Sequence, residues 1–95
     1  MSVRVRPASP IKMTKTTALK LLTEYANLCA GMSHPIAKDA ARMPDRFPES
    51  GSVRKAMRWL GYMQGVMVMS GAFRIDQVKE HSRRGYVFAD QETTI

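Results

Sequence analysis

Two serines and three cations gather near the middle of the chain, and side chains of these types can hold an anion. They are Ser50, Ser52, Arg54, Lys55 and Arg58, at the start of a predicted helix. The free N–H groups and the dipole of a helix N-terminus favour phosphate or carboxylate groups. Cations in the first two turns oppose that dipole unless an anion neutralises them. The pattern predicts a site for an anionic ligand such as a nucleotide, in which the serines donate hydrogen bonds.

Two aromatic residues further along the same helix extend the predicted site. Trp59 or Tyr62 would stack on a base, although Trp59 suits a hydrophobic core equally well. The alternative for the cations is a solvated face that Asp45 and Glu49 partly neutralise. The sequence alone leaves both interpretations open.

The helix that positions these side chains runs from about Ser52 to Met69, and its apolar residues nearly encircle it. A helix that packs on one neighbour buries a stripe of roughly 100°, so a wider apolar surface needs a second partner. Two glycines spaced four residues apart would let another backbone approach closely. The residues predicted to form an oligomer interface are Gly61, Gly65, Met63 and Met67. The alternative is a central helix in a monomeric bundle, because methionine is a common core filler.

Two further helices are predicted before this one. Apolar residues at three- and four-residue spacing predict a long helix that is capped at Thr16 or Thr17. Ser33 then caps a short helix that ends at Pro44, because proline disrupts a continuing helix. Residues 45–50 are expected to form a loop.

A fourth predicted helix, at about 76–84, completes the fold. Gly85 supplies its stop, and basic residues near its C-terminus, including His81, complement the helix dipole. Residues 86–88 are expected to pack back on the domain. The chain is therefore predicted to be an all-α helical bundle of two long and two short helices, oligomeric through the helix at 52–69.

The two ends of the chain are expected to lie outside this single domain, which would span residues 13–88. Residues 1–12 are interpreted as a disordered arm, or as the product of a reading frame that continues through a tRNA gene, which would make Met13 the natural start. A basic arm that follows a DNA groove is the alternative. Residues 89–95 are predicted to form a tail.

The composition favours binding over catalysis. The chain of 95 residues carries 15 Lys and Arg against 8 Asp and Glu, a net charge of +7, which favours anionic partners including nucleic acid. His34, His81 and Cys29 are too few to build a zinc or di-metal centre, and no Walker-type phosphate loop is present. Cys29 falls on an apolar helix face and is predicted to be a core residue. We expect no enzyme activity, catalytic residue, metal or cofactor.

The same features predict a compartment. A single cysteine excludes an internal disulfide and suits a reducing cytosol. The sequence has no 18-residue apolar run and no signal peptide with an apolar core. We therefore expect the chain in the cytosol of a bacterial host, without membrane association.

The segment from Arg54 to Met67, RKAMRWLGYMQGVM, together with the spaced residues GxFxIDxVKxH from Gly71 to His81, resembles small proteins of tailed phages and prophages. The resemblance covers about residues 50–84 and implies a phage origin without an established activity. A fainter similarity, PxS leading into AMxW, is to helical-hairpin sponges with which phages bind cyclic nucleotide signals of host immunity. The acidic residues that this family has before the AMxW segment are basic here.

Three functions are consistent with these observations. The leading hypothesis is a phage anti-defence protein that sequesters an anionic ligand such as a nucleotide immune signal. The second is an inhibitor that docks on a host protein through the Met-rich helix, with its charge steering the encounter. The third is a small DNA-binding regulator that would use Gln77 and Arg74 on base edges, although no convincing helix-turn-helix turn precedes them.

Overall fold

Helices form all the regular structure of residues 12–88, which are the residues that the computed structural model describes. In chain order they are α1 (Lys15–Cys29), α2 (Pro35–Ala40), α3 (Met43–Arg46), α4 (Val53–Met69) and α5 (Ile75–Arg84). The all-α class predicted from the sequence is confirmed for this range. The predicted number of helices is wrong, because one short helix was not anticipated.

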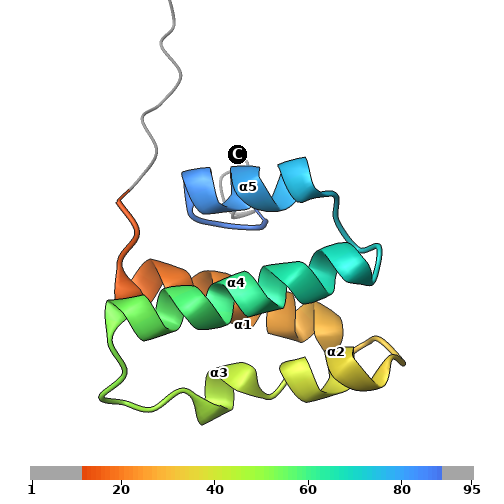
Figure 1. Cartoon of the computed structure of the whole chain (residues 1–95), viewed down its shortest axis with the longest axis horizontal. Coiled ribbons are helices and arrows are strands. Elements are labelled where there is room, and N and C mark those ends of the chain that lie inside the picture. Colours follow the sequence, from red (N-terminus) through yellow and green to blue (C-terminus); the bar gives the residue numbers. More distant parts are fainter. Residues whose placement is uncertain (1–11, 89–95) are drawn as a thin grey trace, which may run out of the picture.

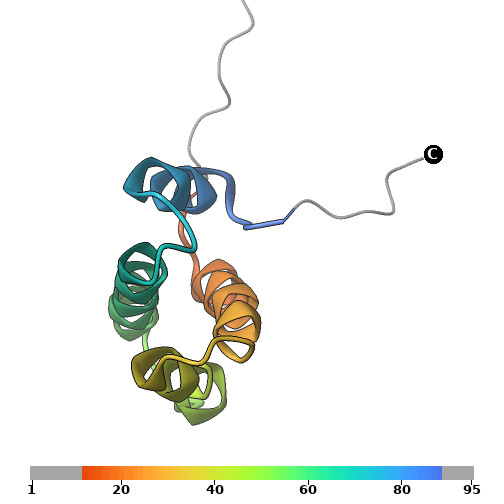
Figure 2. The same ribbon diagram turned by 90° about the vertical axis from the view of Figure 1, so that its right-hand side faces the viewer.

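The long helices α1 and α4 lie side by side and run in the same direction (Figures 1 and 2). At their N-terminal ends, Lys15 Nζ donates a hydrogen bond to the backbone carbonyl of Glu49, at 2.9 Å. Towards the other end, the sulfur of Cys29 lies 3.6 Å from the sulfur of Met63. The segment that contains α2 and α3 returns along one edge of this pair, and α5 crosses back along the other (Figures 1 and 2).

The core forms where the apolar stripe of α1 meets the inner face of α4. Spacings of three and four residues bring apolar side chains to one side of each helix. The fully buried side chains here include Ala18, Leu21, Leu22, Tyr25 and Cys29 of α1, and Ala56, Met63 and Met67 of α4. The prediction that Cys29 is a core residue is confirmed, and burial raises the pKa of its thiol.

Two helices begin at residues other than those predicted. Thr14 caps α1, with its hydroxyl accepting a hydrogen bond from the N–H of Thr17 at 3.1 Å. The predicted caps Thr16 and Thr17 lie inside the helix, because Thr14 can supply the same acceptor one turn earlier. His34 caps α2 in place of Ser33: its Nδ1 accepts from the N–H of Ile36 at 3.1 Å. Proline occupies the first position of α2, so the cap is the residue directly before it.

The prediction that Pro44 ends a helix is wrong, because Pro44 lies in the first turn of α3. A proline is tolerated there because the N–H that it lacks would have no partner within the helix. Part of the predicted loop is therefore helical, and Asp45 and Arg46 belong to α3. The start of α4 agrees with the prediction, with Ser52 as its cap.

The end of α5 is also as predicted. Gly85 terminates this helix in the left-handed conformation, with a φ of 90°, which glycine adopts without a steric penalty. Val87 then packs back on the core, and its N–H donates to Glu24 Oε1 of α1 at 2.8 Å. Arg84 secures the same segment by donating to the carbonyl oxygens of Tyr86 and Val87. The expected packing of residues 86–88 against the domain is confirmed.

His81, which was predicted to complement the dipole of α5 together with its basic neighbours, is a buried residue between helices. The Tyr25 hydroxyl and His81 Nδ1 are hydrogen-bonded at 2.6 Å. Gln64 of α4 lies beside them and donates to Ser82 Oγ at 2.8 Å and to the carbonyl of Val78 at 3.2 Å. This network joins α1, α4 and α5. Burial, with a smaller contribution from the Arg84 charge, lowers the pKa of His81, and burial raises the pKa of Tyr25.

Several predictions from the sequence concern residues 1–11 and 89–95, including the N-terminal arm and the C-terminal tail, and these lie outside the described residues. Among residues 12–88, no helix has both the length and the hydropathy needed to cross a membrane.

The burial of His81 predicts a loss of stability in acid. The folded state disfavours the charged imidazole, so the unfolded chain binds the extra proton first as the pH falls through about 6.5. The free energy of unfolding should therefore decline below that pH and stay level with respect to this group above it. Urea denaturation at a series of pH values measures the decline, which should be shallower in the variant His81→Gln.

The matched control is His34→Asn, which keeps an acceptor at the α2 cap and leaves the buried network intact. This variant should therefore keep the part of the decline that His81→Gln loses. Equal declines in the wild type and His81→Gln would show that His81 is not the group responsible.

Candidate functional site

The N-terminus of α4 is capped by its own chain. The hydroxyl oxygen of Ser52 accepts a hydrogen bond from the N–H of Lys55 at 3.1 Å. That N–H is one of the groups that an anion at this helix end would use. Ser50 lies exposed in the preceding turn. Ser52 is thus explained as a structural cap, and the helix end offers fewer free groups to a ligand than the sequence predicted.

The predicted cations divide into two environments. Arg54 and Arg58 are exposed and lie one helical turn apart, which places them on the same side of α4. Lys55 is half-buried, with its Nζ 5.8 Å from the centroid of the Trp59 ring. Within residues 12–88 the ion pairs are Arg46 with Asp39 and Arg74 with Asp76.

None of these ion pairs reaches the cations of α4. The expected neutralisation by Asp45 and Glu49 is therefore not seen among the described residues. Arg54 and Arg58 therefore have no ion-pair partner within residues 12–88.

Trp59 packs between α4 and the segment that precedes it. Its ring meets Phe47 edge-on, with centroids 5.2 Å apart. Phe47 also lies close to Gly51, where a Cβ would come within 2.5 Å of the ring. The half-buried Trp59 packs against the hydrophobic core, as the alternative interpretation had it. These contacts explain the position of the Trp59 ring without a stacked base. The Tyr62 side chain, by contrast, is 52% exposed.

The four residues predicted to form an oligomer interface do not share one face. Met63 and Met67 have no exposed surface and fill the core against α1, so they are unavailable to a second copy. Gly61 and Gly65 lie exposed on the other side of α4. Helical residues two positions apart do not face the same way, and the predicted grouping overlooked this.

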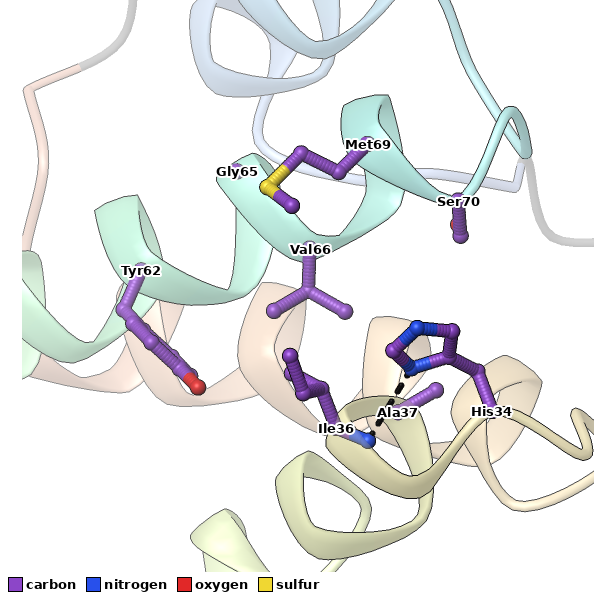
Figure 3. A pocket seen from close by; sticks show the side chains of 8 residues that line it. All are labelled: His34, Ile36, Ala37, Tyr62, Gly65, Val66, Met69 and Ser70. Atoms are coloured by element: carbon purple, nitrogen blue, oxygen red, sulfur yellow. Dashed lines mark hydrogen bonds between the residues drawn. The ribbon is translucent and has the colours of Figure 1, made fainter.

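A groove of about 290 Å³ opens between α2 and the C-terminal half of α4. Figure 3 shows Val66 of α4 pointing towards Ile36 and Ala37 of α2, with Tyr62 at one end and His34 at the other. Ala37 and Val66 are buried and form the floor of the groove.

The rim of the groove is apolar and open to solvent. The side chains of Ile36, Tyr62 and Met69 are 44%, 52% and 81% exposed. Gly65 also lines the groove and leaves room that a larger side chain would fill. Clustered exposed apolar side chains are a feature that binding surfaces commonly have.

Sequence reasoning missed this groove. It depends on how α2 lies across α4, which no local pattern reveals. The one available signal is the succession of an apolar residue and a small one in α2, Ile36 and Ala37, opposite the small Gly65 of α4. That signal becomes specific only once the two helices are known to be neighbours.

The lining of the groove is mainly apolar. Its polar groups are few: the imidazole of His34, the hydroxyl of Tyr62 and that of Ser70. The Nδ1 of His34 is already engaged with the N–H of Ile36. No group of His, Cys, Asp and Glu side chains suited to a metal ion occurs among residues 12–88.

None of the protein families, curated proteins and solved structures with which the chain was compared matches it. The similarity to small phage proteins therefore stays a prediction.

The assignment of Ser52 as a cap predicts a purely structural effect of its removal. Replacing Ser52 with alanine should lower the free energy of unfolding by about 1 kcal/mol, because the N–H of Lys55 loses its acceptor. Ser52→Asp should retain the wild-type stability, since a carboxylate caps equally well and suits the helix dipole. Chemical denaturation measures both variants. An alanine variant as stable as the wild type would contradict the assignment.

Proposed function

We propose that the protein is a non-enzymatic binding protein that docks an acidic helix of a partner protein in the groove between α2 and α4. The observation that carries the proposal is the open apolar groove with the exposed side chains of Ile36, Tyr62 and Met69 on its rim. Its volume of about 290 Å³ is at the small end for a ligand pocket and suits one or two inserted side chains.

The shape of the surface favours a helical partner. An amphipathic helix presents apolar side chains at three- and four-residue spacing and is commonly recognised by a hydrophobic groove. The rim residues Tyr62 and Met69 lie on the same side of α4, two turns apart. A partner helix lying along α4 would contact both and insert an apolar side chain between them.

The charge beside the groove favours an acidic partner. Arg58 lies one turn before Tyr62, and Arg54 one turn before that. Neither arginine has an ion-pair partner among the described residues. Asp or Glu side chains of a partner helix would therefore meet free cations, and the net charge of +7 would accelerate the encounter.

The biological role follows from the origin that the resemblance implies. A protein carried by a prophage would act on a protein of its host, and the groove would then inhibit that protein by occupying one of its helices. This role is the inhibitor hypothesis of the sequence analysis, with the docking surface moved from the buried methionines to the groove.

Sequestration of an anionic ligand such as a nucleotide is the second candidate. The observation in its favour is that Arg54, Lys55 and Arg58 carry no ion pair within the described residues. Against it, Ser52 acts as a helix cap and Trp59 packs on Phe47. Both residues had been assigned to ligand contacts.

DNA reading by α5 has less support. The two residues predicted to contact base edges are engaged at the start of that helix: the Arg74 N–H donates to Gln77 Oε1, and the Arg74 guanidinium pairs with Asp76. Neither side chain is free to read a base without breaking these contacts.

A displayed library of helical peptides, selected against the full chain, tests the docking proposal. Enriched peptides should carry an apolar residue three or four positions from Asp or Glu. The variant Ile36→Glu should weaken their binding by about tenfold or more, because it removes an apolar rim contact and repels acidic peptides. Isothermal titration calorimetry measures the affinities.

The matched control is Ile75→Glu. Ile75 is also an exposed isoleucine near a helix N-terminus, at the start of α5. Its replacement should leave peptide binding unchanged. Peptides that bind Ile36→Glu as tightly as the wild type would rule out the groove.

A thermal-shift titration with mono-, di- and cyclic nucleotides decides the second candidate. A saturable shift that is lost when Arg54 and Arg58 are replaced by Glu would favour the nucleotide role, because a ligand that binds only the folded state raises its stability.

A further inference from the structure

The helix α5 is held to the rest of the fold largely by polar contacts. Of its ten residues only Val78 and His81 are buried, and one of these two is polar. The long helix α1, by contrast, buries six residues. In Figure 1, α5 lies along the edge of the α1–α4 pair that is opposite α2. The groove is lined from α2, α4 and their caps, so the behaviour of α5 is independent of the proposed function.

The uncharged amide of Gln64, on α4, fixes the direction of the hydrogen bonds beneath α5. Its nitrogen lies 3.2 Å from the carbonyl oxygen of Val78, and a carbonyl oxygen can only accept. The same nitrogen donates to Ser82 Oγ at 2.8 Å and reaches the Tyr25 hydroxyl oxygen at 3.4 Å. The Tyr25 hydroxyl therefore accepts on the side of Gln64, and its own hydrogen must point elsewhere.

The hydrogen of the Tyr25 hydroxyl points to His81. The hydroxyl oxygen and His81 Nδ1 are 2.6 Å apart, and Tyr25 has no exposed surface at which water could accept the hydrogen instead. Nδ1 is thus the acceptor, and the neutral imidazole carries its hydrogen on Nε2. In the described part of the chain every buried side-chain nitrogen or oxygen has a hydrogen-bond partner. That remains true at this site only while Nδ1 has no proton.

A proton on His81 Nδ1 would disrupt this arrangement. Nδ1 would become a donor that faces the donor of the Tyr25 hydroxyl. Tyr25 could accept from it only by turning its own hydrogen towards the Gln64 nitrogen, which is a donor as well. Either response leaves a buried donor without an acceptor, and a buried charge is added to it, so the closed structure disfavours the proton.

The charged groups around His81 do not reverse this preference. Glu24 of α1 and Glu80 of α5 favour a positive imidazole, whereas Arg84 of α5 opposes one. Burial is the largest influence and, together with Arg84, lowers the pKa of His81 in spite of the two carboxylates. From the segment before α5, the uncharged ring of Phe73 meets the imidazole edge-on, with centroids 4.8 Å apart.

We propose that protonation of His81 detaches α5, together with residues 85–88, from α1 and α4, while the core between α1 and α4 stays folded. Local opening of this kind takes place where few apolar side chains are buried, and α5 is such a place. Detachment lets water solvate the imidazolium and separates Val87 from Glu24 of α1. It also uncovers Tyr25, so acid exposes a second surface on the edge away from the groove.

Hydrogen exchange of the full chain, followed by mass spectrometry, tests the detachment. Each rate is corrected for the intrinsic effect of pH. An exposed imidazole titrates near pH 6.5, so protection of α5 should fall about tenfold between pH 7.5 and pH 5.5, a range in which ordinary carboxyl groups stay ionised. Protection of α1 and α4 should change much less. In His81→Gln, whose amide oxygen can accept from Tyr25 at any pH, protection of α5 should stay constant over this range.

The single tryptophan, Trp59, reports on the rest of the fold during the same experiment. Its ring packs on Phe47, away from the buried network of α5. The fluorescence of Trp59 should therefore stay constant between pH 7.5 and pH 5.5, whereas unfolding of the whole chain would change it.

The matched control is Val78→Ala, which shortens the other buried side chain of α5 and introduces no titrating group. Protection of α5 should then be lower at both pH values and should still fall about tenfold between them. This comparison and the wild-type rates decide the question even if His81→Gln does not fold.

Three results would overturn the proposal. In the first, α1, α4 and α5 lose protection equally, which would mean that the chain opens as a whole. In the second, protection of α5 in the wild type does not depend on pH. In the third, His81→Gln folds and loses protection of α5 in acid as the wild type does.

Discussion

The packing of α1 against α4 is the contact on which the rest of the structure depends. Leu21 and Leu22 of α1 meet Met63 and Met67 of α4 in a core without exposed surface, and small residues such as Ala56 allow the helices to approach. Because the two helices run in parallel, the chain must return between them, and α2 with α3 makes that return along one edge. The groove exists because this return path lies across α4 without covering it.

The two faces of α4 therefore lie in different environments, one buried and one exposed. Its inner face is bound to α1 and, through Gln64, to the hydrogen-bonded Tyr25 and His81. Its outer face combines glycines with exposed methionines and arginines, a composition that the interior of the fold does not require. Gly61 and Gly65 are unfavourable inside a helix, and packing within residues 12–88 gives no reason for them.

Much of the fold could be predicted from local patterns. The limits of α4, its cap Ser52 and the stop at Gly85 each depend on short-range chemistry that the sequence displays directly. The start of α1 was placed wrongly because three threonines offer the same capping hydroxyl, and Thr14 is the one that caps the helix. Local pattern cannot rank chemically equal candidates.

The candidate site was harder to predict than the fold. Trp59 and Met63 have side chains suited to ligand or partner contacts, yet packing against Phe47 and α1 occupies them. The groove requires α2 to lie beside α4, a relation between segments that are about 30 residues apart in the chain. Composition identified α4 as the element of interest, and only the three-dimensional arrangement separated its buried residues from its available ones.

The parallel course of α1 and α4 also has a consequence for synthesis on the ribosome. The apolar stripe of α1 emerges first, but its partner surface on α4 follows only after the whole return segment has been translated. Until then Leu21, Leu22 and Tyr25 have no place to be buried, and the nascent chain exposes them to chaperones or to other chains. An antiparallel hairpin of the same two helices would shorten that interval. The parallel topology therefore lengthens the time during which the nascent chain can aggregate.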